Sequence, residues 1–247
     1  MNLESGKGSV SGEVWKRHDV AAAFLNERSR LLPDRSRQLE VLLRVLRAAP
    51  RPPGRVLDLG AGDAILLAAI LESFPDASGI AIDFTPSMLE QARLRLVPFG
   101  SRATAVEADL STAAWRQTVA GSFDAVVSGY AIHHLPHERK RTLYEEIFSL
   151  LAEGGTFVNC EHVASPSARL ERMFDEALSE HLWERRRERG EEVTPEQVYQ
   201  EYVSRPDRAA NILAPVEEQC RWLRAIGFKD VDCYWKYFEL AIFGGIR

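Results

Sequence analysis

Short apolar segments alternate with longer amphipathic ones through the middle of the chain. Strands are predicted at 55–59, 78–83, 103–107, 123–128 and 156–160, and helices at 63–74, 85–97 and 137–151. Apolar runs bounded by turn residues are typical of strands buried on both faces, whereas apolar residues three or four apart are typical of helices. This alternation predicts a parallel sheet with helices on both faces, which the right-handed crossover makes a doubly wound α/β fold.

The C-terminal region continues the sheet in a different way. A helix is predicted at 215–226, and two strands follow at roughly 230–237 and 239–246. Only a short turn separates these strands, so we expect an antiparallel hairpin at one side of the sheet. The whole sheet is then a mostly parallel, seven-stranded one within a single domain over 13–247.

Two further helical regions lie outside the alternation and are expected to form a lid. Residues 1–12 are rich in Gly and Ser and predict a disordered tail, while helical spacing recurs over 13–31 and 35–49. The stretch 165–212 is charged and strongly helical. We therefore predict lid elements at 13–50 and 165–212. Four aromatic residues are candidates to line it: Trp15, Phe24, Trp183 and Tyr202.

Charge and composition limit the partners. The chain has 247 residues, and its 31 basic and 36 acidic residues give a formal net charge of −5. This balance argues against non-specific binding to DNA or to an anionic membrane and favours a small-molecule acceptor. Three cysteines without CxxC spacing predict free thiols and no metal site. No signal-peptide core or run of 18 apolar residues is present, so we expect a cytoplasmic monomer or homodimer.

The first strand ends in a glycine turn that predicts a cofactor site. The sequence there is Asp58-Leu59-Gly60-Ala61-Gly62, and glycines let the backbone turn sharply and approach a ligand closely. A dinucleotide fingerprint needs glycine three residues later, where this chain has Ile65. Asp58 would also repel a pyrophosphate, but it suits the cationic, phosphate-free S-adenosylmethionine.

Carboxylates at the ends of the next two strands extend this prediction. Asp83 is placed to accept hydrogen bonds from the ribose hydroxyls, and Asp109 from the exocyclic amine of adenine. Phe84, Met88 and Leu110 would then enclose the adenine ring. Each has an ordinary alternative: Asp83 as a helix cap, Asp109 as a turn residue and Met88 as core.

The motifs jointly resemble the class I S-adenosylmethionine-dependent methyltransferases. VLDLGAGDA, GIAID, EADLS, FDAVVSGYAIHHL and LLAEGGTFV occur in that order across residues 55–160. The resemblance implies a seven-stranded sheet with an antiparallel last strand, S-adenosylmethionine as cofactor and S-adenosylhomocysteine as product. The cofactor contacts it implies are Asp58, Gly60, Ala61, Gly62, Asp83, Phe84, Met88, Asp109, Leu110 and Gly129.

A looser resemblance to carboxy-S-adenosylmethionine synthase runs from Trp15 to the C-terminus. That family makes a cofactor for tRNA wobble uridine modification and holds the transferred carboxylate with an arginine, a task that the resemblance gives to Arg205. A guanidinium suits it, because it grips a carboxylate through two hydrogen bonds. The chain departs from the family at two cofactor contacts, with Arg35 in place of a tyrosine and Gly129 in place of an asparagine. A plain methyltransferase is therefore the preferred interpretation.

Candidates for the acceptor pocket follow the fourth strand. Tyr130 and His133 are candidate catalytic residues, although a base is needed only when the acceptor arrives protonated. His134 is as well suited to packing under the next helix. The substrate candidates are Arg35, Tyr130, His133, His134 and Arg205. Glu161 and His162 end the fifth strand as substrate contacts or strand-end caps. Gly129 is expected to leave a gap for the acceptor. A non-catalytic adenosylmethionine-binding protein remains the alternative outside enzymes.

Overall fold

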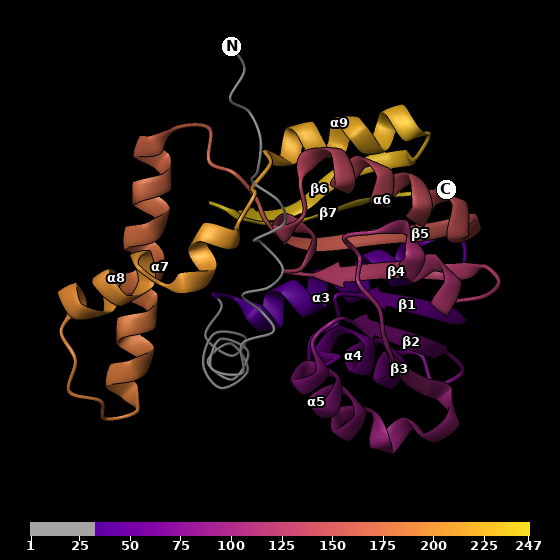
Figure 1. Cartoon of the computed structure of the whole chain (residues 1–247), viewed down its shortest axis with the longest axis horizontal. Helices are drawn as coiled ribbons and strands as arrows, with labels where there is room; N and C mark the ends of the chain where they lie inside the picture. Colours follow the sequence, from indigo (N-terminus) through magenta and orange to yellow (C-terminus); the bar gives the residue numbers. More distant parts are fainter. Residues whose placement is uncertain (1–32) are drawn as a thin grey trace, which may run out of the picture.

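A seven-stranded sheet forms the centre of the computed structural model, which describes residues 33–247 (Figure 1). The strands lie in the order β3-β2-β1-β4-β5-β7-β6. Neighbours among the first five are parallel, whereas β7 is antiparallel to both β5 and β6. The strand bounds are β1 Arg55–Leu59, β2 Ser78–Asp83, β3 Ala103–Glu107, β4 Phe123–Gly129, β5 Leu151–His162, β6 Lys229–Tyr237 and β7 Leu240–Ile246. The predicted sheet and its C-terminal hairpin are confirmed.

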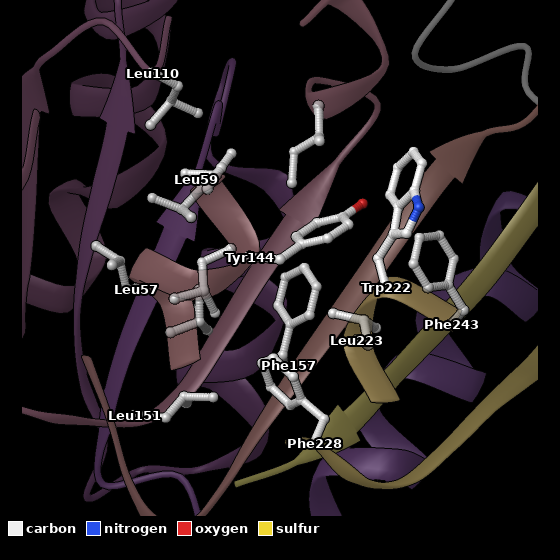
Figure 2. Packing of buried hydrophobic residues seen from close by; sticks show 14 of the residues in the cluster. Leu57, Leu59, Leu110, Tyr144, Leu151, Phe157, Trp222, Leu223, Phe228 and Phe243 are labelled. Carbon is white, nitrogen blue, oxygen red and sulfur yellow. The ribbon is translucent and has the colours of Figure 1, made fainter. Parts of the chain in front are cut away.

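Helices cover both faces of this sheet. The bounds are α3 Arg35–Ala48, α4 Ile65–Ser73, α5 Pro86–Leu96, α6 His137–Leu150 and α9 Val216–Ile226. Figure 1 shows α6 and α9 on one side and α3, α4 and α5 on the other. Because side chains alternate along a strand, Leu57 and Val56 of β1 belong to different buried clusters. Leu57 packs on the α6 and α9 side with Phe157 and Leu223, as Figure 2 shows.

The fifth strand begins earlier than predicted. β5 starts at Leu151, where α6 has just ended at Leu150, and not at residue 156. The pairing with β4 is shifted between Phe123 and Ala125, which makes the start of β5 irregular. A Cβ on Gly155 would lie 3.1 Å from the backbone oxygen of Asp124. Gly155 therefore serves the close approach of two strands.

The predicted helical insertion lies beyond the sheet. It contains α7 Ala168–Glu188, α8 Pro195–Val203 and the 3-10 helix η6 Pro206–Ala210. Figure 1 shows α7 and α8 standing away from the sheet on the side of the α3 label. Phe174 and Tyr202 pack against Leu240, the first residue of β7. Since β7 runs antiparallel to β5, this contact places the insertion at the carboxyl ends of the parallel strands.

Side chains within the insertion are used in different ways. Tyr202 is buried in the cluster with Phe174, whereas the Trp183 indole donates to the Val193 carbonyl at 3.0 Å inside the insertion itself. Arg186 pairs with Glu191 and Glu201.

The remaining predictions concern the N-terminal region, the cysteines and membrane spans. The tail at 1–12, the helix at 13–31, Trp15 and Phe24 lie outside the described residues. Cys160, Cys220 and Cys233 are free thiols. Over residues 33–247, every helix is too short or too polar to cross a bilayer.

Candidate functional site

The glycine turn after β1 lies at the point where the strand order changes direction. Gly60 and Gly62 have φ of 63° and 55°, values that favour glycine. A Cβ on Gly60 would overlap the Cβ of Ala131, which belongs to the loop after β4. The turn is tied to β2 by a hydrogen bond from Ala61 N to Ile82 O at 2.8 Å. In open α/β sheets, ligands bind in the crevice at this place.

Asp58 supplies a buried carboxylate beneath the turn. It is 1% exposed, and its Oδ2 accepts from the Leu67 backbone N–H at 3.2 Å, near the start of α4. Its Oδ1 is buried without a hydrogen-bond partner in the described part of the chain. Burial raises the pKa of Asp58 to about 7, and the Leu67 N–H opposes that rise. A buried carboxylate oxygen in need of a donor fits the ammonium group of S-adenosylmethionine.

Asp83 closes the turn from β2. Its Oδ2 accepts from Gly62 N and its Oδ1 from Thr85 N, both at 2.8 Å. Burial raises the pKa of Asp83. Thr85 is the N-cap of α5, but its side chain makes no capping hydrogen bond. Asp83 thus organises the turn while keeping lone pairs that suit ribose hydroxyls.

The predicted adenine contacts are divided between buried and exposed positions. Met88 and Leu110 are buried and Phe84 is half-buried. A Cβ on Gly62 would lie 4.0 Å from the sulfur of Met88, which places Met88 beside the turn. Asp109 is exposed, and its Oδ1 accepts from Ser111 N at 2.8 Å in a local turn. The turn role of Asp109 is therefore seen directly, and its adenine contact stays a prediction.

The prediction of a gap beside Gly129 is wrong. A Cβ at this position would lie 2.8 Å from Cδ1 of Leu66, so the leucine of α4 already occupies that space. Gly129 is therefore a packing requirement of α4 against β4. The same contact leaves no room for a larger side chain on β4 unless Leu66 moves.

Tyr130 and Arg35 meet at the start of α3. The Tyr130 hydroxyl donates to Gln38 Oε1 at 2.8 Å, and Arg35 Nη1 donates to the same oxygen at 3.3 Å. The Arg35 guanidinium lies 5.8 Å from the Tyr130 ring centre and lowers the pKa of Asp58 by its charge. Burial raises the pKa of Tyr130 far above its usual value. The Tyr130 hydroxyl is therefore neutral and bonded to Gln38, and its catalytic role stays a prediction.

His133 and Glu161 form the most notable contact among the acceptor candidates. His133 Nδ1 lies 2.5 Å from Glu161 Oε1, and both side chains are buried. Burial lowers the pKa of His133 well below its usual value. A second pair lies beside it, with His162 Nε2 at 2.8 Å from Glu239 Oε2. The sequence placed Glu161 and His162 at this edge, but it did not predict either pairing.

His134 contacts the insertion, and both its acceptor role and its packing under the next helix stay predictions. Its Nδ1 lies 3.3 Å from the Ala210 carbonyl, at the end of η6. Its ring centre is 3.9 Å from that of His133. Burial lowers the pKa of His134 well below its usual value, which keeps it neutral. His134 thus joins the loop after β4 to the insertion.

Lys140 is a functional candidate that sequence reasoning missed. It is fully buried in α6, and its Nζ donates to the carbonyls of Leu135 at 2.6 Å, His133 at 3.4 Å and Ile212. The Ile212 N–H also donates to the His133 carbonyl at 2.9 Å. Burial lowers the pKa of Lys140 to about 8. The available signal was its position, three residues before Leu143 on the apolar face of a predicted helix.

Arg205 lies close to this group but its guanidinium is already engaged. Its Nε donates to Asp207 at 3.3 Å, and its Nη1 donates to the Tyr202 carbonyl at 2.6 Å. The guanidinium also stacks at 4.0 Å on the Tyr202 ring. The charges of Arg205 and Asp207 both act on the pKa of His133, so the insertion brings them to the same site.

Comparison with known proteins gives this site a chemical context. Residues 56–155 match a methyltransferase domain family. A carboxy-S-adenosyl-L-methionine synthase of Campylobacter lari is 22% identical over 229 residues, covering 91% of each chain. A demethylmenaquinone methyltransferase of Clavibacter sepedonicus is 28% identical over 224 residues, covering 90% of this chain and 84% of the relative.

A solved structure shows the same fold with the cofactor bound. Human N-acetylserotonin methyltransferase in complex with SAM aligns with a TM-score of 0.61 and 13% identity. The alignment covers 98% of this chain and 60% of the human one. Residues 56–155 thus form a methyltransferase domain with the glycine turn and two buried carboxylates at its switch point, and the chain has the fold of the class I S-adenosylmethionine-dependent methyltransferases.

Proposed function

We propose that the protein methylates a small molecule whose acceptor atom carries a proton, such as a hydroxyl group, and that His133 accepts that proton. The contact between His133 Nδ1 and Glu161 Oε1 at 2.5 Å carries this proposal. If Nδ1 donates to the carboxylate, the lone pair of the ring is at Nε2. Because burial lowers the pKa of His133, the neutral, basic form dominates near pH 7.

The loop that bears His133 is held against the cofactor turn. Ala131, two residues before His133, packs on Gly60. S-adenosylmethionine supplies an activated methyl group, so the protein mainly has to align the acceptor and remove its proton. Asp58 suits the ammonium group and Asp83 suits the ribose, which leaves the loop after β4 for the acceptor side.

Two features support a small acceptor. The insertion with α7 and α8 packs at the carboxyl edge through Phe174 and Tyr202, which is where a lid would close. The net charge of −5 also disfavours a nucleic acid substrate. We therefore propose that the insertion is a lid over a small molecule.

The test uses S-adenosylmethionine with a deuterated methyl group and the full-length chain. We would incubate it separately with the small-molecule fraction, the tRNA and the protein of a cell extract, and follow the label by mass spectrometry. Label in the small-molecule fraction is expected, at a rate at least about 100-fold lower for His133→Asn than for the parent. His137→Asn, at an exposed position, is the matched control and should retain the parental rate.

Two results would overturn the proposal. Transfer of label only to tRNA or protein would reject the small acceptor. Full activity of His133→Asn would reject its role as proton acceptor. Binding of S-adenosylmethionine without transfer to any of the three fractions would favour the alternative of a non-catalytic binding protein.

Carboxy-S-adenosylmethionine synthesis is the second candidate function. It is favoured by relatives of that name that align over most of the chain, and by the position of Arg205 near His133. Against it, the Arg205 guanidinium already donates to Asp207 and Tyr202, and Leu66 fills the space where a side chain at residue 129 would project. The mass of the ligand that co-purifies decides: a species heavier than S-adenosylmethionine by one carboxylate would establish the synthase.

A further inference from the structure

A chain of buried polar side chains runs from α9 through the core to His133. Its members, here called the relay, are Gln219, Tyr144, Asn159 and Glu161. All four side chains belong to residues that are 0% exposed. We propose that Gln219, Tyr144 and Asn159 are positioning residues that keep the proton of His133 on Nδ1 and so leave Nε2 as the acceptor. The catalytic consequence rests on the proposed function of His133.

The Ala214 carbonyl fixes which group donates in each hydrogen bond of the relay. Gln219 Nε2 lies 3.1 Å from the carbonyl oxygen of Ala214. A carbonyl can only accept, so the amide nitrogen of Gln219 must face Ala214 and its oxygen must face the other way. That oxygen lies 2.6 Å from the Tyr144 hydroxyl. The hydroxyl therefore donates to Gln219, and its single hydrogen is used.

The Tyr144 hydroxyl in turn fixes the orientation of the Asn159 amide. With its hydrogen committed to Gln219, the Tyr144 oxygen can only accept from its other neighbour. Asn159 Nδ2 lies 3.4 Å from this oxygen and 3.3 Å from Glu161 Oε2. The amide nitrogen has two hydrogens, one for each contact. Figure 2 shows the Tyr144 ring beside Phe157, with its oxygen directed toward the side where Trp222 of α9 lies.

Glu161 then meets donors on both oxygens. Asn159 donates to Oε2, and the His162 backbone N–H donates to Oε1 at 2.9 Å. A backbone N–H and an amide N–H cannot accept, so both contacts favour the carboxylate over the carboxylic acid. An ionised Glu161 accepts only, and the 2.5 Å contact therefore requires the hydrogen on His133 Nδ1. The Ala214 carbonyl, just before α9, thereby sets the tautomer of the histidine.

Opposing influences on the pKa of Glu161 explain why the hydrogen bond from Asn159 is needed. Burial raises the pKa of Glu161 to about 7, and the charge of Lys140 from α6 lowers it. The other groups that face the pair are His134 on its own loop, His162 on β5, and Arg205 and Asp207 from the insertion. Without the Asn159 donor, the carboxyl would take up a proton more readily, and the Nδ1 hydrogen of His133 would lose its fixed acceptor.

The test is nuclear magnetic resonance of the full chain labelled with 15N-histidine and 13C-glutamate, in the presence of S-adenosylhomocysteine. His133→Asn and Glu161→Gln spectra assign the signals. The parent should show His133 with hydrogen on Nδ1. Asn159→Leu should raise the titration midpoint of Glu161 by about one pH unit, because one hydrogen bond to a charged group is lost, and should shift His133 toward the Nε2–H form.

Two further variants guard against a folding artefact. Tyr144→Phe removes only a hydroxyl and should move both signals in the same direction by a smaller amount. Trp115→Phe is the matched control, because it removes a buried hydrogen bond of 2.7 Å to Glu146 that lies outside the relay. It should leave the Glu161 midpoint and the His133 tautomer as in the parent.

The outcomes separate the relay from the proposed function. An Nε2–H tautomer in the parent would overturn the relay, and so would unchanged His133 and Glu161 signals in both Asn159→Leu and Tyr144→Phe. If the signals shift as expected but His133→Asn retains methyl transfer, the relay stands and the catalytic role of His133 fails. If His133→Asn is inactive but the signals do not shift, the catalytic role of His133 stands and the relay fails.

Discussion

Arg208 Nη1 and Nη2 each donate to one carboxylate oxygen of Asp175, both at 2.8 Å. This two-pronged ion pair joins η6 to α7, and the Asp175 side chain is only 6% exposed. Such geometry is both strong and directional. It holds the return segment of the insertion, which carries Arg205 and Asp207, in a fixed place above the candidate acceptor site.

Loosening this pair should affect the acceptor more than the cofactor. For Asp175→Asn we expect the rate of methyl transfer to fall about 10-fold, because the Arg208 guanidinium loses its charged partner and one of its two acceptor oxygens. The affinity for S-adenosylmethionine should stay within about twofold, since the cofactor turn is on another element. Isothermal titration and the transfer assay measure the two effects. Arg185→Ala, which removes an exposed ion pair with Glu188, should change neither, and equal losses in both measurements would contradict the lid.

Gly60 should tolerate no side chain. In Gly60→Ala the new methyl group overlaps the Cβ of Ala131 and the backbone keeps φ of 63°. We expect a loss of at least about 2 kcal/mol in the free energy of unfolding, together with loss of cofactor binding.

Gly190→Ala is the control for backbone strain alone. Its φ is 79° and a Cβ there would meet nothing within 4 Å, so it should cost only about 1 kcal/mol. Urea denaturation of both variants measures the difference. Equal losses would show that the contact between the turn and Ala131 is unimportant.

Cofactor affinity should depend on pH through Asp58. The pKa of Asp58 in the free protein is about 7, so below that pH the carboxyl is neutral and attracts the ammonium group less. A bound cation favours the ionised form, hence binding releases a proton and affinity rises with pH. Between pH 6 and 7.5 we expect an increase of about eightfold, because the ionised fraction of a group with this pKa rises by that factor, measured by calorimetry at pH values where the amino group is still mainly charged. Asp58→Asn should bind weakly and without this slope, and a sloping mutant would assign the effect to another group.

The two remaining acids should differ in importance. Asp83→Ala removes the acceptor for Gly62 N and Thr85 N as well as the predicted ribose contact. We expect it to abolish the increase in melting temperature that S-adenosylmethionine gives the parent. Asp109→Ala removes an exposed side chain that is bonded to Ser111 N, and affinity should fall about 10-fold if the adenine contact exists. A parental melting shift in Asp83→Ala would refute the ribose assignment.

The sequence predicted the parts of this fold that depend on local pattern. Val56, Leu57 and Leu59 are buried in β1 because helices cover both faces of the sheet, and a strand covered on both faces is a mostly apolar run. The start of β5 was missed for a physical reason. Gly155 is required because the Asp124 backbone lies close to it. The sequence does not distinguish such a glycine from one that ends a helix.

The sequence predicted which residues lie at the carboxyl edge of the sheet, but not how their side chains pair. Parallel strands end at one edge, so Asp58, Asp83 and Glu161 had to lie there. Whether His133 turns toward Glu161 depends on side-chain rotation and on the loop between them. Gln219 and Asn159 gave no signal, because the sequence alone does not show whether an amide side chain is buried.

The Lys140 ammonium and the Ile212 amide attach the returning end of the insertion to the loop of His133. A substrate that entered by lifting this end of the insertion would therefore have to detach it from the histidine loop. Entry of the substrate would then loosen the backbone of the histidine loop, and the return of the insertion would restore its position.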